Sequence, residues 1–380
     1  MIETLRSVAS LLLSFGLLLM ANGLFGTLLG VRAAGAGFST LVVGVIMAGY
    51  FVGLLAGGRY AVHIVARVGH IRAFAAFASI MSTSALMHAM WADPVAWFVL
   101  RMMAGFCMAG FCMAGMILVT ESWLNERAVN ETRGQVLAFY MITNYFAAGC
   151  GQFLLPLGDP AQFELFSVAS IIFSLALVPV LLTKAAAPRP AAPQIMKIRD
   201  LYTISPMGFM GVLSAGLCNA AFYAMAPVFS TRIGLTGREI SIFMASAIMG
   251  GLLLQWPIGK LSDRVDRRWV LAATTLLTAG ACAGLVFFAP QGATTPLFIS
   301  AAIYGSILFT VYSVSAAHDV VCWSARAIHV SRDHLRIAWH LRDLSYDSPC
   351  RTRPQTVHRC ANQQFQLGGT VYRSSRSGCP

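Results

Sequence analysis

The chain has 380 residues, of which 57% are hydrophobic and only 11% charged, and its formal net charge is +12. Soluble domains carry charge on about a quarter of their residues, so this composition nearly excludes a cytosolic enzyme. The basic residues are scattered over short segments between apolar runs. Because a nucleic-acid interface needs a basic face with stacking aromatics, no nucleic-acid partner is expected.

Ten apolar stretches of 18 or more residues are long enough to cross a bilayer. None of them contains Asp or Glu, and nine contain neither Arg nor Lys. Backbone groups in hydrocarbon must hydrogen-bond within their own segment, so each stretch is predicted to be a helix in contact with lipid. The predicted spans are 8–31, 39–58, 73–92, 95–120, 134–158, 165–183, 205–230, 240–258, 269–289 and 292–316.

The longest polar connection is rich in Pro and Ala, which is typical of a semi-rigid linker. It predicts an N-terminal six-helix bundle at 1–183, a cytoplasmic linker at 184–204, and a C-terminal bundle of four helices at 205–316. The fold class expected is an all-α polytopic membrane protein with two pseudo-repeated bundles. The second half has two helices fewer than the first, so about ten of twelve helices are present.

Basic residues between the spans predict the orientation. With the N-terminus inside, the inner segments carry 14 Lys and Arg residues before residue 317 and the outer loops carry three. Cytoplasmic loops carry the basic excess in membrane proteins, so the N-terminus is expected to be cytoplasmic.

The two halves resemble each other in the loop that follows their second helix. These loops read RVGHIR at 67–72 and GKLSDRVDRR at 259–268, and aligning Arg67 with Arg264 gives an offset of 197 residues. A parallel repeat of this size is one plan for transporters, with the binding site between the halves near the middle of the membrane.

The composition changes at about residue 317. Residues 318–380 contain nine Arg but no Lys or Glu, five of the eight His, four of the nine Cys and no apolar run long enough to span. The segment 317–380 is therefore expected to be a tail outside the membrane. It is either frameshifted sequence that begins near Ser315–Asp319 or a genuine disordered tail; a Cys/His metal site is disfavoured because the tail has no CxxC pair.

The loop at 259–268 is the most specific motif. Gly259 is expected to end its helix, Asp263 can pair with an Arg, and Arg264, Arg267 and Arg268 place charge at the lipid interface. Such a network can hold two helices together in one state and break in the other. The alternative is an anchor that only sets the orientation.

Arg101 is the one charge well inside a span. An intramembrane Arg costs about 2.5–3.5 kcal/mol on insertion scales and is expected to face a cavity or a partner. It either controls substrate binding or coupling, or extends to the outer interface. Glu121, at the inner end of the same span, either shuttles protons or has the structural role at an inner gate that we favour.

Ten polar or aromatic residues within the spans are candidates for a substrate site. Each could equally form a hydrogen bond between helices, worth about 0.6 kcal/mol on average. They are Asn22, Tyr140, Asn144, Tyr145, Gln152, Asn219, Tyr223, Gln255, Tyr304 and Tyr312.

Several motifs resemble those of the major facilitator superfamily. GKLSDRVDRR is similar to its G-x-x-x-D-R-x-G-R-R signature, except that Asp266 replaces the second Gly, and the stretch Arg101 to Gly105 resembles its R-x-x-x-G pattern. GFSTLVVGVIMAGYFVG, RVGHIRAFAAF, ESWLNERAVNETRG and YMITNY resemble a bacterial subgroup of sugar- or drug-type permeases with unassigned substrate. The resemblance covers roughly 1–316.

This resemblance implies that the first, fifth and seventh helices line a central cavity, which favours Asn22, Asn144, Asn219 and Tyr223 as substrate-binding residues. It implies a multi-pass protein of the bacterial inner membrane, acting as a monomer without a cofactor or metal. The expected function is secondary transport of a small organic solute by alternating access, with proton coupling left open.

Two other classes were weighed. A truncated product that inserts into the bilayer without transporting is the main alternative, because of the tail. An intramembrane enzyme is disfavoured because Arg101 is the only ionisable side chain well inside the spans that offers chemistry.

Overall fold

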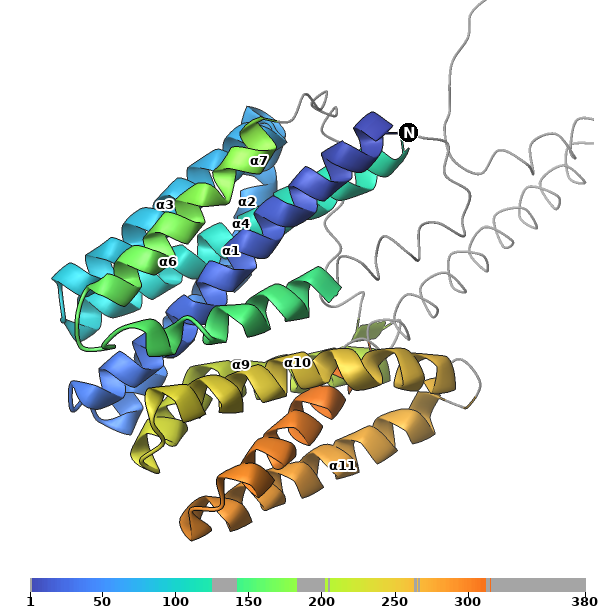
Figure 1. The fold of residues 1–380 in the computed structure, drawn as a ribbon. Helices are drawn as coiled ribbons and strands as arrows, with labels where there is room; N and C mark the ends of the chain where they lie inside the picture. The colour runs from blue at the N-terminus through green and yellow to red at the C-terminus, as the bar shows by residue number, and fades with distance from the viewer. Residues whose placement is uncertain are drawn as a thin grey trace, which may run out of the picture. The chain divides into compact units, whose positions relative to one another are not determined.

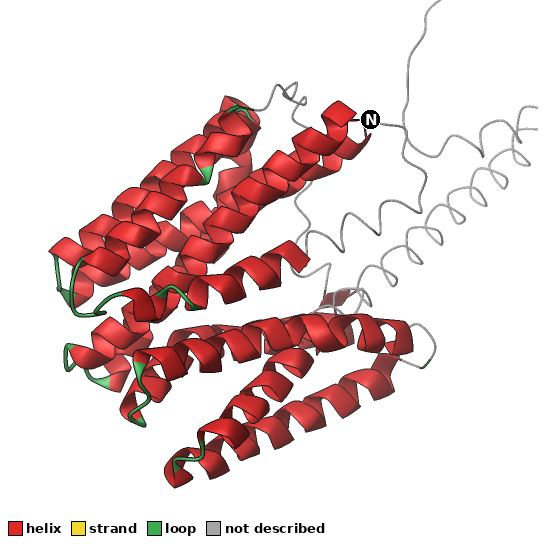
Figure 2. Ribbon diagram, in the orientation of Figure 1, coloured by secondary structure: helices red, strands yellow, loops and turns green. Residues whose placement is uncertain are grey.

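The computed structural model describes residues 2–124, 142–182, 202–203, 206–262, 265, 267–311 and 315, all of which lie within the unit Met1–Trp323. In these ranges the chain forms helices joined by short loops and contains no strand (Figure 2). The tail 317–380 and nearly all of the linker 184–204 lie outside them. The division into 1–183 and 205–316 therefore stays a prediction, as does the cytoplasmic N-terminus.

The described part of the first half begins with long helices and continues with shorter ones (Figure 1). They are α1 (Ile2–Gly35), α2 (Thr40–Val68), α3 (His70–Met90), α4 (Pro94–Leu124), a helical segment at 142–152, η1 (Leu155–Leu157), α6 (Glu164–Leu175) and α7 (Leu177–Leu181). Within this half α2 packs on α4, α3 packs on α4 and α6, and α1 packs on α6.

The described part of the second half contains α9 (Pro206–Arg232), α10 (Gly237–Ser262), α11 (Arg267–Phe288), η2 (Ala289–Gln291) and a helical segment at 294–311. In Figure 1 these helices follow one another from yellow to orange. The halves meet where α9 packs on α1 and α2.

Nine helices in the described part of the chain are long and apolar enough to cross a membrane, and they correspond to nine of the ten predicted spans. The remaining predicted span, 134–158, is described only from residue 142 onward, and it is helical at 142–152. The expected all-α polytopic fold is confirmed.

Helix boundaries follow from local hydrogen bonding. At the start of α10 the amide and hydroxyl of Thr236 both donate to the Glu239 carboxylate at 2.8 Å, while the Glu239 amide donates back to the Thr236 hydroxyl at 3.4 Å. This reciprocal arrangement satisfies donors that the first helical turn leaves free. Between α2 and α3 the chain turns at Gly69, whose φ of 88° favours glycine.

Glycine brings α2 and α4 into direct backbone contact. A Cβ added to Gly53 would lie 1.8 Å from the Met102 carbonyl oxygen, and one added to Gly105 would lie 1.8 Å from the Tyr50 carbonyl oxygen. Small residues allow this close approach in membranes, where packing replaces the hydrophobic effect as the force between helices.

The same contact recurs in the second half, between α10 and the segment 294–311. A Cβ on Gly250 would lie 2.4 Å from the Ala302 carbonyl oxygen, and one on Gly305 would lie 1.9 Å from the Ala247 carbonyl oxygen. Gly250 follows its counterpart on α2 by the 197 residues that the loop alignment predicts, and Gly305 follows its counterpart on α4 by 200. The two halves are thus repeats in packing as well as in sequence.

Contacts between the halves are of a different kind. A Cβ on Gly30 of α1 would lie 2.8 Å from Cβ of Pro227 on α9, and a Cβ on Gly149 would lie 2.6 Å from Cγ of Met249 on α10. At these two places the glycine meets a side chain of the other half, and no backbone atom is among its nearest neighbours.

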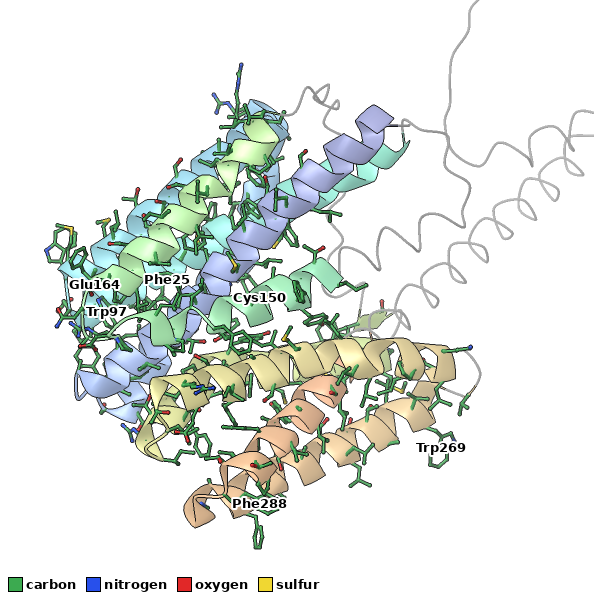
Figure 3. All side chains as sticks on the ribbon, viewed as in Figure 1. Phe25, Trp97, Cys150, Glu164, Trp269 and Phe288 are labelled. Carbon is green, nitrogen blue, oxygen red and sulfur yellow. The ribbon has the colours of Figure 1, made fainter. Side chains whose placement is uncertain are left out.

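Many large apolar side chains point outward. In Figure 3, Trp269 and Phe288 project away from the helices that carry them, and Trp269 is 74% exposed. Exposed apolar surface on this scale favours aggregation in water, whereas it matches the hydrocarbon of a bilayer.

A serine cluster links α3 to α6. The Ser82 hydroxyl lies 2.7 Å from the Ser170 hydroxyl and 3.0 Å from the Ser174 hydroxyl. We expect Ser82→Ala to lower the stability of the folded chain by about 0.6 kcal/mol, the average for such bonds. Thermal unfolding in detergent measures this. Thr83→Val is the control, because the bond described for the Thr83 hydroxyl stays within its own helix, to the Ser79 carbonyl oxygen. An equal loss in both variants would contradict the prediction.

Candidate functional site

A cavity of about 270 Å³ lies among helices of both halves. Its walls come from α1, α2, α4, the segment 142–152 and α9. The lining residues are Leu19, Asn22, Gly23, Gly26, Thr27, Tyr50, Phe51, Arg101, Met108, Asn144, Tyr145, Ala148, Gln152, Asn219 and Tyr223.

The structure brings the four favoured substrate residues together. Asn22 on α1, Asn144 on the segment 142–152, and Asn219 and Tyr223 on α9 all line this cavity. Uncharged amides and hydroxyls of this kind can hydrogen-bond a polar solute while costing less to bury than charges. Their proposed role rests on this placement.

The six other candidates divide into three groups. Tyr145 and Gln152 also line the cavity. Tyr304 lies instead in the apolar core, with its ring 5.2 Å from the ring of Phe222. Gln255 belongs to α10, but its side chain is not among those described, and Tyr140 and Tyr312 fall outside the described residues.

Gln152 holds the cavity wall together. Its Oε1 accepts from the Thr27 hydroxyl at 2.6 Å, and its Nε2 donates to the carbonyl oxygens of Gly23 and Ala148 at 3.0 and 3.3 Å. Since the amide already has partners on α1 and on its own helix, it serves packing rather than solute binding.

Arg101 lines the cavity and is only 5% exposed. Its guanidinium carbon lies 4.6 Å from the centroid of the Tyr50 ring and 5.9 Å from that of Phe25, which is labelled in Figure 3. Both distances suit a cation–π contact. This buried position is the one expected for a cavity-facing Arg, and not for a side chain that extends to the outer interface.

Tyr50 is one of the cavity residues that sequence reasoning missed. Besides facing Arg101, it lies near the Asn22 side chain of α1, which lines the same cavity. The resemblance directed attention to the first, fifth and seventh helices. The R-x-x-x-G pattern held a usable signal, because Gly105 lets the backbone of Tyr50 approach α4 one turn from Arg101.

The predicted gating residues are only partly described. Glu121 lies in the last turn of α4, but its side chain is not described. Asp263 and Arg264 lie outside the described residues, while Arg267 and Arg268 begin α11 without described side chains. Their roles stay predictions.

One expectation about this loop is wrong: Gly259 does not end its helix. The helix α10 continues through Gly259 to Ser262. A glycine inside a helix costs only about 1 kcal/mol relative to alanine, so a long membrane helix tolerates it.

In the described ranges no group of three or more His, Cys, Asp or Glu side chains could hold a metal ion. The Cys and His residues of the tail lie outside these ranges. The cavity therefore offers uncharged polar groups, aromatic rings and one cation to a solute.

A sequence model of the Major Facilitator Superfamily matches residues 11–322. The chain belongs to this superfamily. The family resemblance seen in the motifs is thus confirmed, and the chain is a multi-pass membrane transporter rather than an enzyme.

Relatives and solved structures agree with this assignment. A protein of Escherichia coli O17:K52:H18, described as the uncharacterised major-facilitator-type transporter YcaD, is 28% identical over 321 residues, which are 82% of this chain and 79% of that protein. The nucleoside transporter NupG superposes with a TM-score of 0.68 at 14% identity, over 84% of this chain and 82% of NupG. A D-xylose–proton symporter superposes with a TM-score of 0.59 at 15% identity, over 85% of this chain and 81% of the symporter.

Proposed function

We propose that this superfamily member is a secondary transporter of a small organic solute, and that the solute binds in the cavity between α1, α4, the segment 142–152 and α9. The observation that supports this most is that polar side chains from both halves converge on one cavity, including all four residues favoured beforehand. In parallel-repeat transporters the site lies at the interface between the repeats.

In this proposal Asn22, Asn144, Asn219 and Tyr223 bind the solute, and Arg101 links binding to the driving gradient. Rocking of one half against the other then opens the cavity to each side of the membrane in turn. We assign an inner-gate role to Glu121 and to five residues of the loop at 259–268. These are Gly259, Asp263, Arg264, Arg267 and Arg268. The N-terminus is cytoplasmic, the unit is a monomer in the inner membrane, and no cofactor takes part.

The test is uptake of a panel of labelled solutes by the purified full chain in proteoliposomes, with and without an imposed proton gradient. Uptake that saturates supports the proposal, and dependence on the gradient supports proton coupling. A chain that inserts and stays monodisperse but moves no member of a broad panel would favour the alternative, a membrane protein that does not transport.

We expect Asn144→Leu and Asn219→Leu each to reduce uptake by about 10-fold, because each removes a hydrogen bond to the solute worth about 0.5–1.5 kcal/mol and leaves a polar atom of the solute unpaired. The initial uptake rate below saturation measures this. The matched control is Gln162→Leu, an exposed amide in the loop before α6. Equal rates in all three variants would contradict the assignment.

A further inference from the structure

The cavity contains a cation with no counter-anion in the described part of the chain. Arg101 is 5% exposed, its Nε has no hydrogen-bond acceptor, and the described groups that interact with its charge do not include a carboxylate. None of the ten predicted spans contains Asp or Glu, so the spans themselves bring no carboxylate to the cavity. A buried charge ordinarily has a partner, and the described residues around Arg101 do not supply an anionic one.

The groups that face Arg101 attract a cation without neutralising it. Tyr50 and Phe25 present ring faces to the guanidinium, and a ring face carries a quadrupole but no net charge. The cavity therefore keeps a net positive charge. Because none of the other residues that line it carries a charge and a buried site has a lower dielectric than water, that charge acts strongly on anything that enters.

A second unpaired atom lies in the same cavity. Oδ1 of Asn219 is buried and has no hydrogen-bond donor. An amide oxygen accepts hydrogen bonds, so a hydroxyl or amino group of a ligand would satisfy it. Two groups in the cavity would therefore be satisfied by a ligand: Arg101 by an anion, and Asn219 by a hydrogen-bond donor.

The size of the cavity limits the ligand. At about 270 Å³ it lies at the lower edge of the range of about 300–1,000 Å³ for small-molecule pockets. This suits a metabolite-sized molecule better than a large amphipathic drug. The apolar and aromatic part of the lining, including Phe51, Tyr145 and Met108, would contact its carbon skeleton.

We infer that the transported solute is a small organic anion that carries at least one hydroxyl or amino group, with its anionic group on Arg101 and its donor on Asn219. This inference rests on the proposed function and narrows it to a substrate class. Arg suits the role because its planar fork can bind a carboxylate or phosphate through two parallel hydrogen bonds.

The experiment compares molecules that share a carbon skeleton and differ in one terminal group, which makes them anionic, neutral or cationic. The probes form two matched sets, gluconate with glucitol and glucamine, and 4-hydroxybenzoate with 4-hydroxybenzyl alcohol and 4-hydroxybenzylamine, with glycerol 3-phosphate and chloride as further anions. Binding to the purified full chain is followed by thermal stabilisation in detergent, which does not depend on transport. We expect at least one organic anion to raise Tm in a saturable way while its neutral and cationic counterparts do not.

Variants of Arg101 connect this selectivity to the cavity. Arg101→Gln is expected to weaken binding of that anion by at least 100-fold, and Arg101→Lys by about 10-fold, because Lys keeps the charge but loses the planar fork. Arg232→Gln is the matched control, since Arg232 is exposed at the end of α9. If Arg101→Gln is not monodisperse, Asn219→Leu, which retains Arg101, is expected to keep selectivity for anions over neutral counterparts at reduced affinity.

The inference is overturned if neutral or cationic members bind as well as the anions, if no organic anion of the panel binds, or if Arg101→Gln retains the affinity of the wild type. Stabilisation by chloride that organic anions do not exceed overturns it as well. The proposed function can fail independently of this inference. If the chain transports a neutral solute and Asn144→Leu reduces that transport, the proposed function stands and only the anionic substrate class is wrong. If the chain transports nothing, both the proposed function and the substrate class are wrong.

Discussion

Gly105→Ala is expected to prevent the chain from folding to a stable, monodisperse form. A single methyl group there would lie 1.8 Å from the Tyr50 carbonyl oxygen, and a backbone atom cannot turn aside as a side chain can. Overpacking typically costs about 1–3 kcal/mol of stability and sometimes more. Because this clash is with backbone, we expect a cost of about 3 kcal/mol or more. Separation of α2 from α4 would also displace Tyr50 from Arg101.

The measurement is the yield and melting temperature of the purified protein by fluorescence-detected size-exclusion chromatography. Gly58→Ala is the matched control, because Gly58 lies on the same pair of helices and a Cβ there would have no neighbour within 4 Å. Alanine favours a helix over glycine by about 1 kcal/mol, so the control should equal or exceed the wild type. A stable Gly105→Ala protein would mean that α2 and α4 are farther apart than described here.

Arg101→Ala is expected to abolish gradient-driven accumulation of the solute, with a loss of at least about 100-fold in rate, or about 2.7 kcal/mol. The variant removes the one cation among the described residues of the cavity wall and leaves the Tyr50 and Phe25 ring faces without their partner. Uptake under an imposed proton gradient measures the effect, with Arg232→Ala as the control. Accumulation at the rate of the wild type would remove Arg101 from the mechanism.

A second assay separates two roles of Arg101. Counterflow exchanges external labelled solute for an excess of internal unlabelled solute with no imposed proton gradient, so it needs binding but not coupling. If Arg101 holds the solute, as we infer above, counterflow is lost together with accumulation. If Arg101 only links a gradient to movement, counterflow persists in Arg101→Ala.

The membrane spans could be predicted from sequence because every segment that crosses the hydrocarbon core must be apolar and must satisfy its backbone hydrogen bonds within a helix. Some of the residues that line the cavity could also be predicted from the cost of polar groups in hydrocarbon. Polar side chains are costly in lipid, so the few that occur in spans, such as Asn22 and Asn144, point inward in the structure. The resemblance then indicated which helices to consider.

Other features depend on contacts that no single segment encodes. Gln152 had the same sequence signature as Asn219, yet Thr27 on α1 and two carbonyl groups occupy its amide. Tyr50 is not among the candidates from the sequence, because only the packing of α4 against α2 places Arg101 against its ring. Gly259 looked like a helix end, but α10 continues past it, since a weak local preference does not outweigh the hydrogen bonding of a helix in lipid.

The glycine contacts have a mechanical consequence. Inside each half, the backbones of two helices are in direct contact, at Gly53 between α2 and α4 and at Gly250 between α10 and the segment 294–311. Each of these helix pairs therefore has little freedom to slide and moves as a rigid unit. Across the halves, Gly149 rests on the unbranched thioether chain of Met249, which can change rotamer at little cost. At Gly149 and Met249 the contact between the halves can thus adjust, as the rocking motion proposed above requires.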